Sequence, residues 1–210
     1  MPHPPASTPT QKLYRPEYYS DARPELIVRA YPFATLITEP LLATATPITF
    51  ERDDVAHTLV GHLSRKNPHA QAMRDGDAVL AIFSGPHAYI SPRWYVEKPE
   101  VPTWNYVAAH VRGRLEMLDK EEDAIAVLRR TIEVCEADFE NPLSIADMPD
   151  GRVGFLTPMI RAFRLHVESI EGVSKLSQKH PPGDRARIVN GLREQPAKDI
   201  ADLMEERDQS

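Results

Sequence analysis

A short polar segment after a predicted strand contains the residue types that bind phosphate. The segment is Gly61-His62-Leu63-Ser64-Arg65-Lys66-Asn67. The Arg65 guanidinium can donate through a planar fork, Lys66 adds a point charge, and the Ser64 hydroxyl with backbone N–H groups can fill the remaining oxygen lone pairs. An ordinary solvated turn is the alternative interpretation. The residue types alone leave both interpretations open; the candidate phosphate residues are Ser64, Arg65 and Lys66, with His62 and Asn67 flanking them.

A second segment contains aromatic and hydrogen-bonding side chains suited to a flat ligand. It is Ser84-Gly85-Pro86-His87-Ala88-Tyr89-Ile90-Ser91-Pro92, followed by Val101-Pro102-Thr103-Trp104-Asn105-Tyr106. If residues 87–89 are extended, His87 and Tyr89 point to the same side. Such groups could stack on a heterocycle and donate hydrogen bonds to it. A structural aromatic cluster beneath a long loop is the alternative.

Other common catalytic patterns are missing from the sequence. His57, His62 and His69 have no HExxH or paired-carboxylate context, so we expect no metal site. There is no G-x-S-x-G elbow and no P-loop. Cys135 falls on the apolar stripe of a predicted helix, which predicts a buried, inert thiol. No residue is assigned a catalytic role.

Composition limits the class of protein. The 210 residues include 20 prolines, which excludes an all-helical bundle and favours short strands and turns. The formal net charge of −6 gives no general attraction to nucleic acid or anionic lipid. A single cysteine excludes an intramolecular disulfide framework. With no secretory signal and no run of 18 apolar residues, we expect a cytoplasmic protein that does not enter a membrane.

The hydrophobic periodicity predicts a mainly β chain. Expected strands are Phe33–Thr38, Leu42–Phe50, Thr58–Leu63, Ala78–Phe83, Val101–Leu118 (one strand, or two joined at Gly113) and Arg161–Ile170. Expected helices are Glu25–Ala30, one that starts at an Asp119-x-x-Glu122 capping box and ends before Asn141, and two in the tail around Ile188–Leu192 and Ile200–Met204. Antiparallel alternation with few helices indicates a barrel or sandwich with helical decorations.

Several motifs together resemble a known family. In chain order they are Tyr14-Arg15-Pro16, Leu42-Ala43-Thr44-Ala45-Thr46-Pro47, Gly61–Arg65, the Gly85–Tyr95 and Val101–Tyr106 blocks, and Lys175-Leu176-Ser177-Gln178. This set is similar to the PaiB-type family, the FMN-binding negative transcriptional regulators of protease and sporulation genes. The resemblance covers about residues 13–195, and the Gly-Pro-His-Ala-Tyr-Ile-Ser-Pro and Val-Pro-Thr-Trp-Asn-Tyr blocks are its specific parts.

The resemblance implies a split β-barrel, related to pyridoxamine-phosphate oxidases and flavin reductases, that works as a homodimer with FMN at the subunit seam. In that wider group a strand followed by Ser-Arg-Lys holds the flavin phosphate, which matches residues 64–66. Many PaiB-type relatives lack the lysine, so Lys66 departs toward the oxidase pattern. The remaining cofactor-site candidates implied by the resemblance are His87, Tyr89, Trp104, Lys175 and Gln178. The implied organisation is a flexible leader (1–12), a split-barrel domain (13–180) and a helical tail (181–210).

Two functions from different classes remain open. The first is a flavin-binding repressor that contacts promoter DNA through a partner, or through a patch formed by Arg112, Arg114, Arg129 and Arg130 in the dimer. The second is an FMN-dependent oxidoreductase or flavin reductase, in which the protein orients the ring and the cofactor supplies the redox chemistry. A pocket for haem or another planar ligand near His62 or His87 is a third possibility. We favour the flavin-binding regulator over the enzyme.

Overall fold

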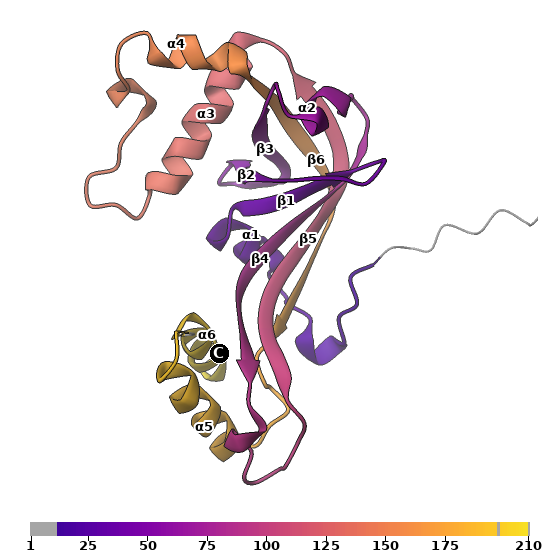
Figure 1. The fold of residues 1–210 in the computed structure, drawn as a ribbon, viewed down its shortest axis with the longest axis vertical. Coiled ribbons are helices and arrows are strands. Elements are labelled where there is room, and N and C mark those ends of the chain that lie inside the picture. The colour runs from indigo at the N-terminus through magenta and orange to yellow at the C-terminus, as the bar shows by residue number, and fades with distance from the viewer. Residues whose placement is uncertain (1–11, 197, 210) are drawn as a thin grey trace, which may run out of the picture.

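The computed structural model describes residues 12–196 and 198–209, and its centre is a closed antiparallel barrel (Figure 1). The strands are β1 (Phe33–Thr38), β2 (Leu42–Arg52), β3 (Val55–Ser64), β4 (Ala78–Ile90), β5 (Thr103–Leu118) and β6 (Ile160–Lys175). Their order around the barrel is β1-β2-β3-β6-β5-β4, and β1 closes the ring by pairing with β4. The expected mainly β split barrel is confirmed.

The core forms because alternate residues of each strand point inward. On β5, Val107, Ala109, Val111 and Leu115 are buried, whereas the alternate residues 108, 110, 112 and 114 are at least partly accessible. Phe83 and Phe163 lie fully buried at the barrel centre. This period-two burial matches the sequence pattern of residues 101–118.

Three strands continue beyond the barrel as an arm, which comprises residues 84–90, 103–108 and 171–175. The ladder of β4 and β5 extends to the pair Ile90–Thr103, and that of β5 and β6 extends to Tyr106–Lys175. Figure 1 shows the arm descending from the barrel. Its length follows from the long strands β4, β5 and β6, because β1 pairs with β4 only up to Phe83.

Helices cover the barrel and the arm at separate places. The α-helices are α1 (Pro24–Ala30), α2 (Pro68–Ala72), α3 (Glu121–Glu136), α4 (Arg152–Leu156), α5 (Pro182–Arg193) and α6 (Lys198–Asp208), with 3-10 turns η1 (Glu17–Tyr19), η2 (Pro92–Trp94), η3 (Ile145–Asp147) and η4 (Thr157–Met159). Figure 1 shows α3 and α4 beside the barrel, and α5 with α6 beside the arm. None of the described helices is long and apolar enough to cross a membrane.

Two expectations about α3 are wrong. The helix starts at Glu121 with Lys120 as its N-cap and no side-chain cap bond, so the Asp119-x-x-Glu122 capping box does not form. Asp119 instead lies 3.8 Å from the Arg161 guanidinium. Cys135 is exposed rather than buried, because only the first half of α3 packs on the barrel, through Ala124 and Val127.

A bulge accounts for the interruption predicted at Gly113. The β5–β6 register shifts between Arg112 and Gly113, where one extra β6 residue is accommodated. A Cβ on Gly113 would lie 1.9 Å from the carbonyl oxygen of His166. Only glycine therefore lets the two backbones approach at this point, and β5 continues as one strand. The predicted leader, residues 1–12, lies outside the described residues except for Lys12.

Candidate functional site

The predicted phosphate segment forms a tight loop, residues 64–67, between β3 and α2. The Lys66 N–H donates to Ser64 Oγ at 3.3 Å, and the Asn67 N–H donates to the Ser64 carbonyl at 2.9 Å. Asn67 caps α2, because its Oδ1 accepts from the His69 N–H at 2.9 Å. The 64–67 loop is therefore held from both ends by its own hydrogen bonds.

The cations of the 64–67 loop are available to an anion. Ser64, Arg65 and Lys66 are all exposed. Across the described residues, no carboxylate lies within ion-pair distance of Arg65 or Lys66, although most other arginines of this acidic chain are paired. A guanidinium, an ammonium and a hydroxyl on three successive residues fit the donor set that a phosphate dianion requires.

A small cavity beside the loop contains groups that the sequence analysis missed. Its volume is about 290 Å³, and Arg65, Gln71 and Arg161 line it together with Asp119. The Gln71 side-chain amide donates to the Arg65 carbonyl at 3.2 Å, which ties α2 to the loop. Arg161 reaches this cavity because β3 pairs with β6, where Ser64 lies opposite Ile160. This pairing of distant segments is not visible in the local sequence.

His62 and His69 have different environments from each other. His69 is buried, with its ring nitrogens 2.9 Å from Thr38 Oγ1 and 3.0 Å from Thr44 Oγ1, so it is a structural residue at the barrel end. His62 projects from the outer face of β3, and its buried Nδ1 has no partner within the described chain. Burial lowers the pKa of His62, which favours the neutral imidazole at neutral pH. No group of three or more potential metal ligands occurs among the described His, Cys, Asp and Glu residues.

The second predicted group assembles on one face of the arm. His87 and Tyr89 alternate with buried Ala88 and Ile90, so they share the exposed face as expected. Tyr89 lies opposite Trp104 in the ladder, and the two rings pack edge to face with centroids 6.0 Å apart. The His87 and Trp104 rings are 6.2 Å apart. A stacking surface with an imidazole beside it results.

Lys175 joins this face from β6. It lies opposite Tyr106 in the ladder, and its ammonium donates to Thr103 Oγ1. The Tyr19 ring, on η1, lies 5.8 Å from the Lys175 Nζ. Burial lowers the pKa of Lys175. The sequence analysis missed Tyr106, although it has the same strand parity as Trp104, and missed Tyr19, which only the tertiary fold brings here.

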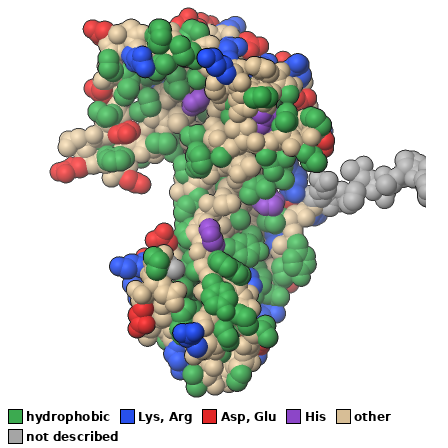
Figure 2. Space-filling model, in the orientation of Figure 1, with side chains coloured by type: hydrophobic (Ala, Val, Ile, Leu, Met, Phe, Trp, Pro, Cys, Tyr) green, Lys and Arg blue, Asp and Glu red, His purple; other side chains and the backbone are tan. Residues whose placement is uncertain are grey.

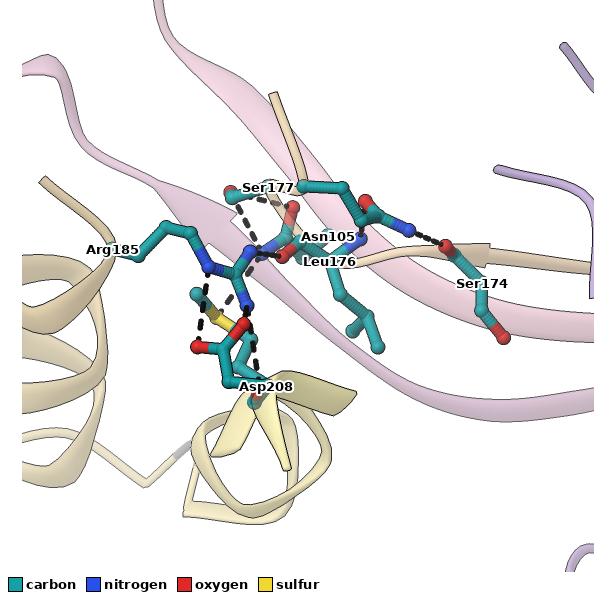
Figure 3. A network of polar contacts seen from close by, with 8 residues as sticks. Asn105, Ser174, Leu176, Ser177, Arg185 and Asp208 are labelled. Carbon is teal, nitrogen blue, oxygen red and sulfur yellow. Dashed lines mark hydrogen bonds and ion pairs between the residues drawn. The ribbon is translucent and has the colours of Figure 1, made fainter. Parts of the chain in front are cut away.

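Gln178, the last predicted cofactor residue, has its amide in a local turn. Its Oε1 accepts from the Leu176 N–H at 2.8 Å, and its Nε2 donates to the Ser174 carbonyl. Figure 3 shows this turn beside Ser177, which adopts a left-handed backbone with φ 58°. The Lys175–Gln178 motif thus shapes the exit of β6, and a cofactor contact by Gln178 stays a prediction.

The tail helices fix the arm through two buried charges. Arg185 donates to the Leu176 carbonyl at 2.6 Å and pairs with Asp208 of α6 (Figure 3). Asp184 is fully buried and accepts the N–H groups of Val96, Glu97 and Lys98. These contacts join α5 to the exit of β6 and to the loop between β4 and β5, so the arm is braced by the tail.

The candidate residues fall into two separate groups within one chain. The length of β6 gives the distance between the two groups. Ser64 of the loop pairs with Ile160, the first residue of β6, and Lys175 of the arm face is its last residue. Fifteen steps at about 3.3 Å each give about 50 Å along the strand. That exceeds the reach of a ribityl phosphate, so one flavin cannot contact both groups of the same copy.

The chain matches the family model described as "Putative FMN-binding domain" over residues 13–169. It is 33% identical over 204 residues to "Protease synthase and sporulation protein PAI 2" of Bacillus subtilis, which covers 93% of this chain and 98% of the relative. It is also 30% identical over 182 residues to an uncharacterized protein of Emericella nidulans, with 71% of this chain and 72% of the relative covered.

Solved structures show the same fold at low identity. A conserved hypothetical protein of Mycobacterium tuberculosis superposes with a TM-score of 0.56 at 13% identity, covering 80% of this chain and 94% of that one. An FAD- and haem-binding protein of Mycobacterium smegmatis gives 0.53 at 17% identity, covering 81% and 78%. From the family match and the Bacillus relative, the chain belongs to the PaiB-type family of FMN-binding split-barrel proteins.

Proposed function

We propose that this protein is a flavin-dependent regulator in which the 64–67 loop holds the phosphate of FMN. The observation that carries the proposal is the pair of exposed, carboxylate-free cations at Arg65 and Lys66, directly after β3. The Ser64 hydroxyl completes the donor set, because it accepts from the Lys66 N–H and keeps its own proton to donate. Bound FMN supplies a redox-active ring, and the chain supplies anchoring and orientation.

Removing both cations tests the phosphate assignment. Each charge-assisted contact contributes roughly 1.5–3 kcal/mol, so Arg65→Ala with Lys66→Ala should weaken FMN binding at least about a hundredfold. The control pair Lys120→Ala with Arg129→Ala removes the same charge from α3 and its N-cap, and should leave binding unchanged. The readout is flavin titration followed at about 450 nm. Unchanged retention in the first variant, with its circular dichroism intact, rejects the assignment.

We propose further that two copies form the flavin site. The 64–67 loop and the aromatic face of the arm lie at opposite ends of β6. A two-fold axis can place the loop of one copy against the arm of the other. His87, Tyr89 and Trp104 would then face the ring of a flavin anchored by the partner. This arrangement supports a homodimer in which each copy contributes to both sites.

Mixing two defective copies tests the shared site. The Arg65→Ala/Lys66→Ala copy lacks the anchor, and a Trp104→Ala/Tyr89→Ala copy lacks the stacking face. Refolded together in equal amounts, about half of the dimers are mixed and each mixed dimer has one intact site, so FMN binding should return to about a quarter of the wild-type stoichiometry, or about half in the isolated mixed dimer. Binding by neither pure variant and none by the mixture, with dimers demonstrated by mass, argues against sites shared in this way.

A direct promoter contact needs cations that carboxylates do not neutralise. Of the proposed patch, Arg112 pairs with Glu171 at 2.8 Å, Arg114 with Glu168 at 3.1 Å, and Arg130 with Asp53. These pairs favour repression through a partner over direct reading of DNA by this patch. Mobility-shift titrations across a salt series distinguish the two routes, because direct phosphate contacts weaken steeply with salt.

The second candidate function is an FMN-dependent oxidoreductase. The observation that favours it is the exposed arm face, where Trp104 is 53% and Tyr89 47% accessible, so a second planar molecule has room beside the ring. Oxidation of NAD(P)H by the flavin-loaded protein, with a defined acceptor, tests this function. Turnover that depends on bound FMN supports the enzyme, and its absence with several acceptors supports the regulator.

A further inference from the structure

An apolar cavity lies on the outer side of β3, whereas the cavity beside the 64–67 loop is lined mainly by charged and polar residues. The volume of the apolar cavity is about 480 Å³, within the range of small-molecule sites. Eight of its eleven lining residues are apolar, and they come from α3, from residues 145–148 at η3 and from the stretch of residues 153–160. We call it the α3–α4 cavity. Its apolar wall includes Leu128, Ile132, Met148 and Leu156.

Three polar residues line one part of the cavity and indicate which ligand groups it can bind. His62 and Ser64 reach it from β3, and Arg152 reaches it from the first position of α4. The Arg152 guanidinium lies 5.4 Å from the centroid of the Phe155 ring. Within the described chain it has no ion-pair partner, in contrast to Arg130 and Arg161, which pair with Asp53 and Asp119.

The His62 side chain adds an unsatisfied hydrogen-bonding group. Neither of its ring nitrogens bonds to another described residue, and Nδ1 is buried. Buried polar groups are normally paired, so an unpaired imidazole beside an apolar cavity marks a place where a ligand or ordered water completes the bonding. A ligand for this cavity therefore needs an apolar body and a polar, negatively charged end.

We propose that the α3–α4 cavity binds a compact apolar carboxylic acid, with its carboxylate at Arg152 and its body against the α3 wall. A cation would meet the unpaired guanidinium, and a larger polar molecule would leave its groups unsatisfied against the aliphatic wall. The cavity adjoins the proposed FMN site at His62 and Ser64, but Arg152 and the apolar wall, rather than Arg65, Lys66 and the arm, would hold its ligand. An apolar acid bound here would be a second ligand of the protein.

Calorimetric titration with 1-naphthoate tests the proposal, with neutral 1-naphthalenemethanol as the matched probe. We expect one naphthoate per chain, bound at least about fivefold more tightly than the alcohol because of the charged contact. Arg152→Gln should remove this preference and leave the affinity for the alcohol within about twofold. Arg129→Gln, an exposed arginine on α3 that does not line the cavity, should change neither affinity.

Filling the cavity gives an independent test. Ile132→Trp should abolish binding of both probes, whereas Ala126→Trp, on the exposed side of α3, should preserve it. If Ile132→Trp fails to fold, the Arg152→Gln preference decides alone. Equal affinities of acid and alcohol for the wild type overturn the proposal. So does displacement of naphthoate by FMN, which would assign the cavity to the flavin site, while FMN retention measured separately still tests the 64–67 loop.

Discussion

Asn105 and Ser177, 72 residues apart, exchange two hydrogen bonds where the chain leaves the arm after β6. Asn105 Nδ2 donates to Ser177 Oγ at 3.0 Å, and the Ser177 hydroxyl donates to Asn105 Oδ1 at 3.1 Å (Figure 3). Asn105 is completely buried, and Ser177 is 4% exposed. These residues belong to two of the motifs that carry the family resemblance, so part of that signature encodes the architecture of the arm.

Breaking this pair should destabilise the protein without changing the exposed face. Asn105→Ala leaves the buried Ser177 hydroxyl without its partner, so we expect a loss of about 1–3 kcal/mol in the free energy of unfolding. Urea denaturation measures the loss. A double-mutant cycle with Ser177→Ala should give a coupling energy above about 0.5 kcal/mol, and additive losses would show that the two side chains do not act together.

Gly113 should be the least replaceable glycine of the barrel. In Gly113→Ala the new methyl group meets the His166 carbonyl at 1.9 Å, and since that atom belongs to the backbone, β6 has to shift. We expect a cost of about 1–3 kcal/mol or more, measured by thermal and urea unfolding. Gly154→Ala on α4 is the control, because a Cβ there has nothing within 4 Å and alanine favours the helix. Equal effects of both changes would contradict the bulge geometry.

The sequence predicted the barrel well because period-two alternation reports burial directly. Residues 101–118 separated into a core face and an accessible face, and β5 has that division. The prediction ended β4 at Phe83, since Gly85-Pro86 is typical of a turn. In the structure β4 continues to Ile90, because the register shift between Ser84 and His87 accommodates the proline and pairing with Trp104 and Tyr106 outweighs the local signal.

The sequence identified most of the candidate residues, but it did not predict how they are arranged in space. Arg65 and Trp104 were both identified, but the distance between their groups depends on strand pairing, and nothing local in the sequence determines that Ser64 lies opposite Ile160. The same limit concealed Arg161 and Tyr19, which reach their groups only in the folded chain.

Asp184 should make the bracing of the arm sensitive to acid. Burial opposes its ionisation, yet the Arg187 guanidinium and three backbone N–H groups outweigh that effect and hold the pKa of Asp184 well below its usual range. Because the folded pKa is lower than the unfolded pKa, this stabilisation is complete above about pH 4 and is lost as the pH falls below it. Asp184→Asn should therefore be less stable than the wild type at pH 7 and lose less stability between pH 6 and pH 3.

Urea midpoints measured across that pH range test the Asp184 prediction. The control is Asp138→Asn, an exposed residue just beyond α3 with no hydrogen bond or ion pair to the described residues. It should follow the wild-type pH dependence. If Asp184→Asn has the same pH dependence as the wild type, the carboxylate does not stabilise the 96–98 backbone as an anion.

The two tryptophans should respond differently to flavin, because they occupy different surfaces. Trp104 is 53% exposed on the arm face, whereas Trp94 is partly buried and packs so closely on α5 that a Cβ on Gly191 would lie 2.2 Å from its ring. In Trp94→Phe, where Trp104 is the remaining tryptophan, stoichiometric FMN should quench most of the emission, since a stacked flavin accepts the excitation energy. In Trp104→Phe the quenching should be much weaker, and adding Arg65→Ala and Lys66→Ala to Trp94→Phe should remove it. Equal quenching of both tryptophans would place the flavin ring away from the arm. That result would reject a flavin site shared between the loop of one copy and the arm of the other.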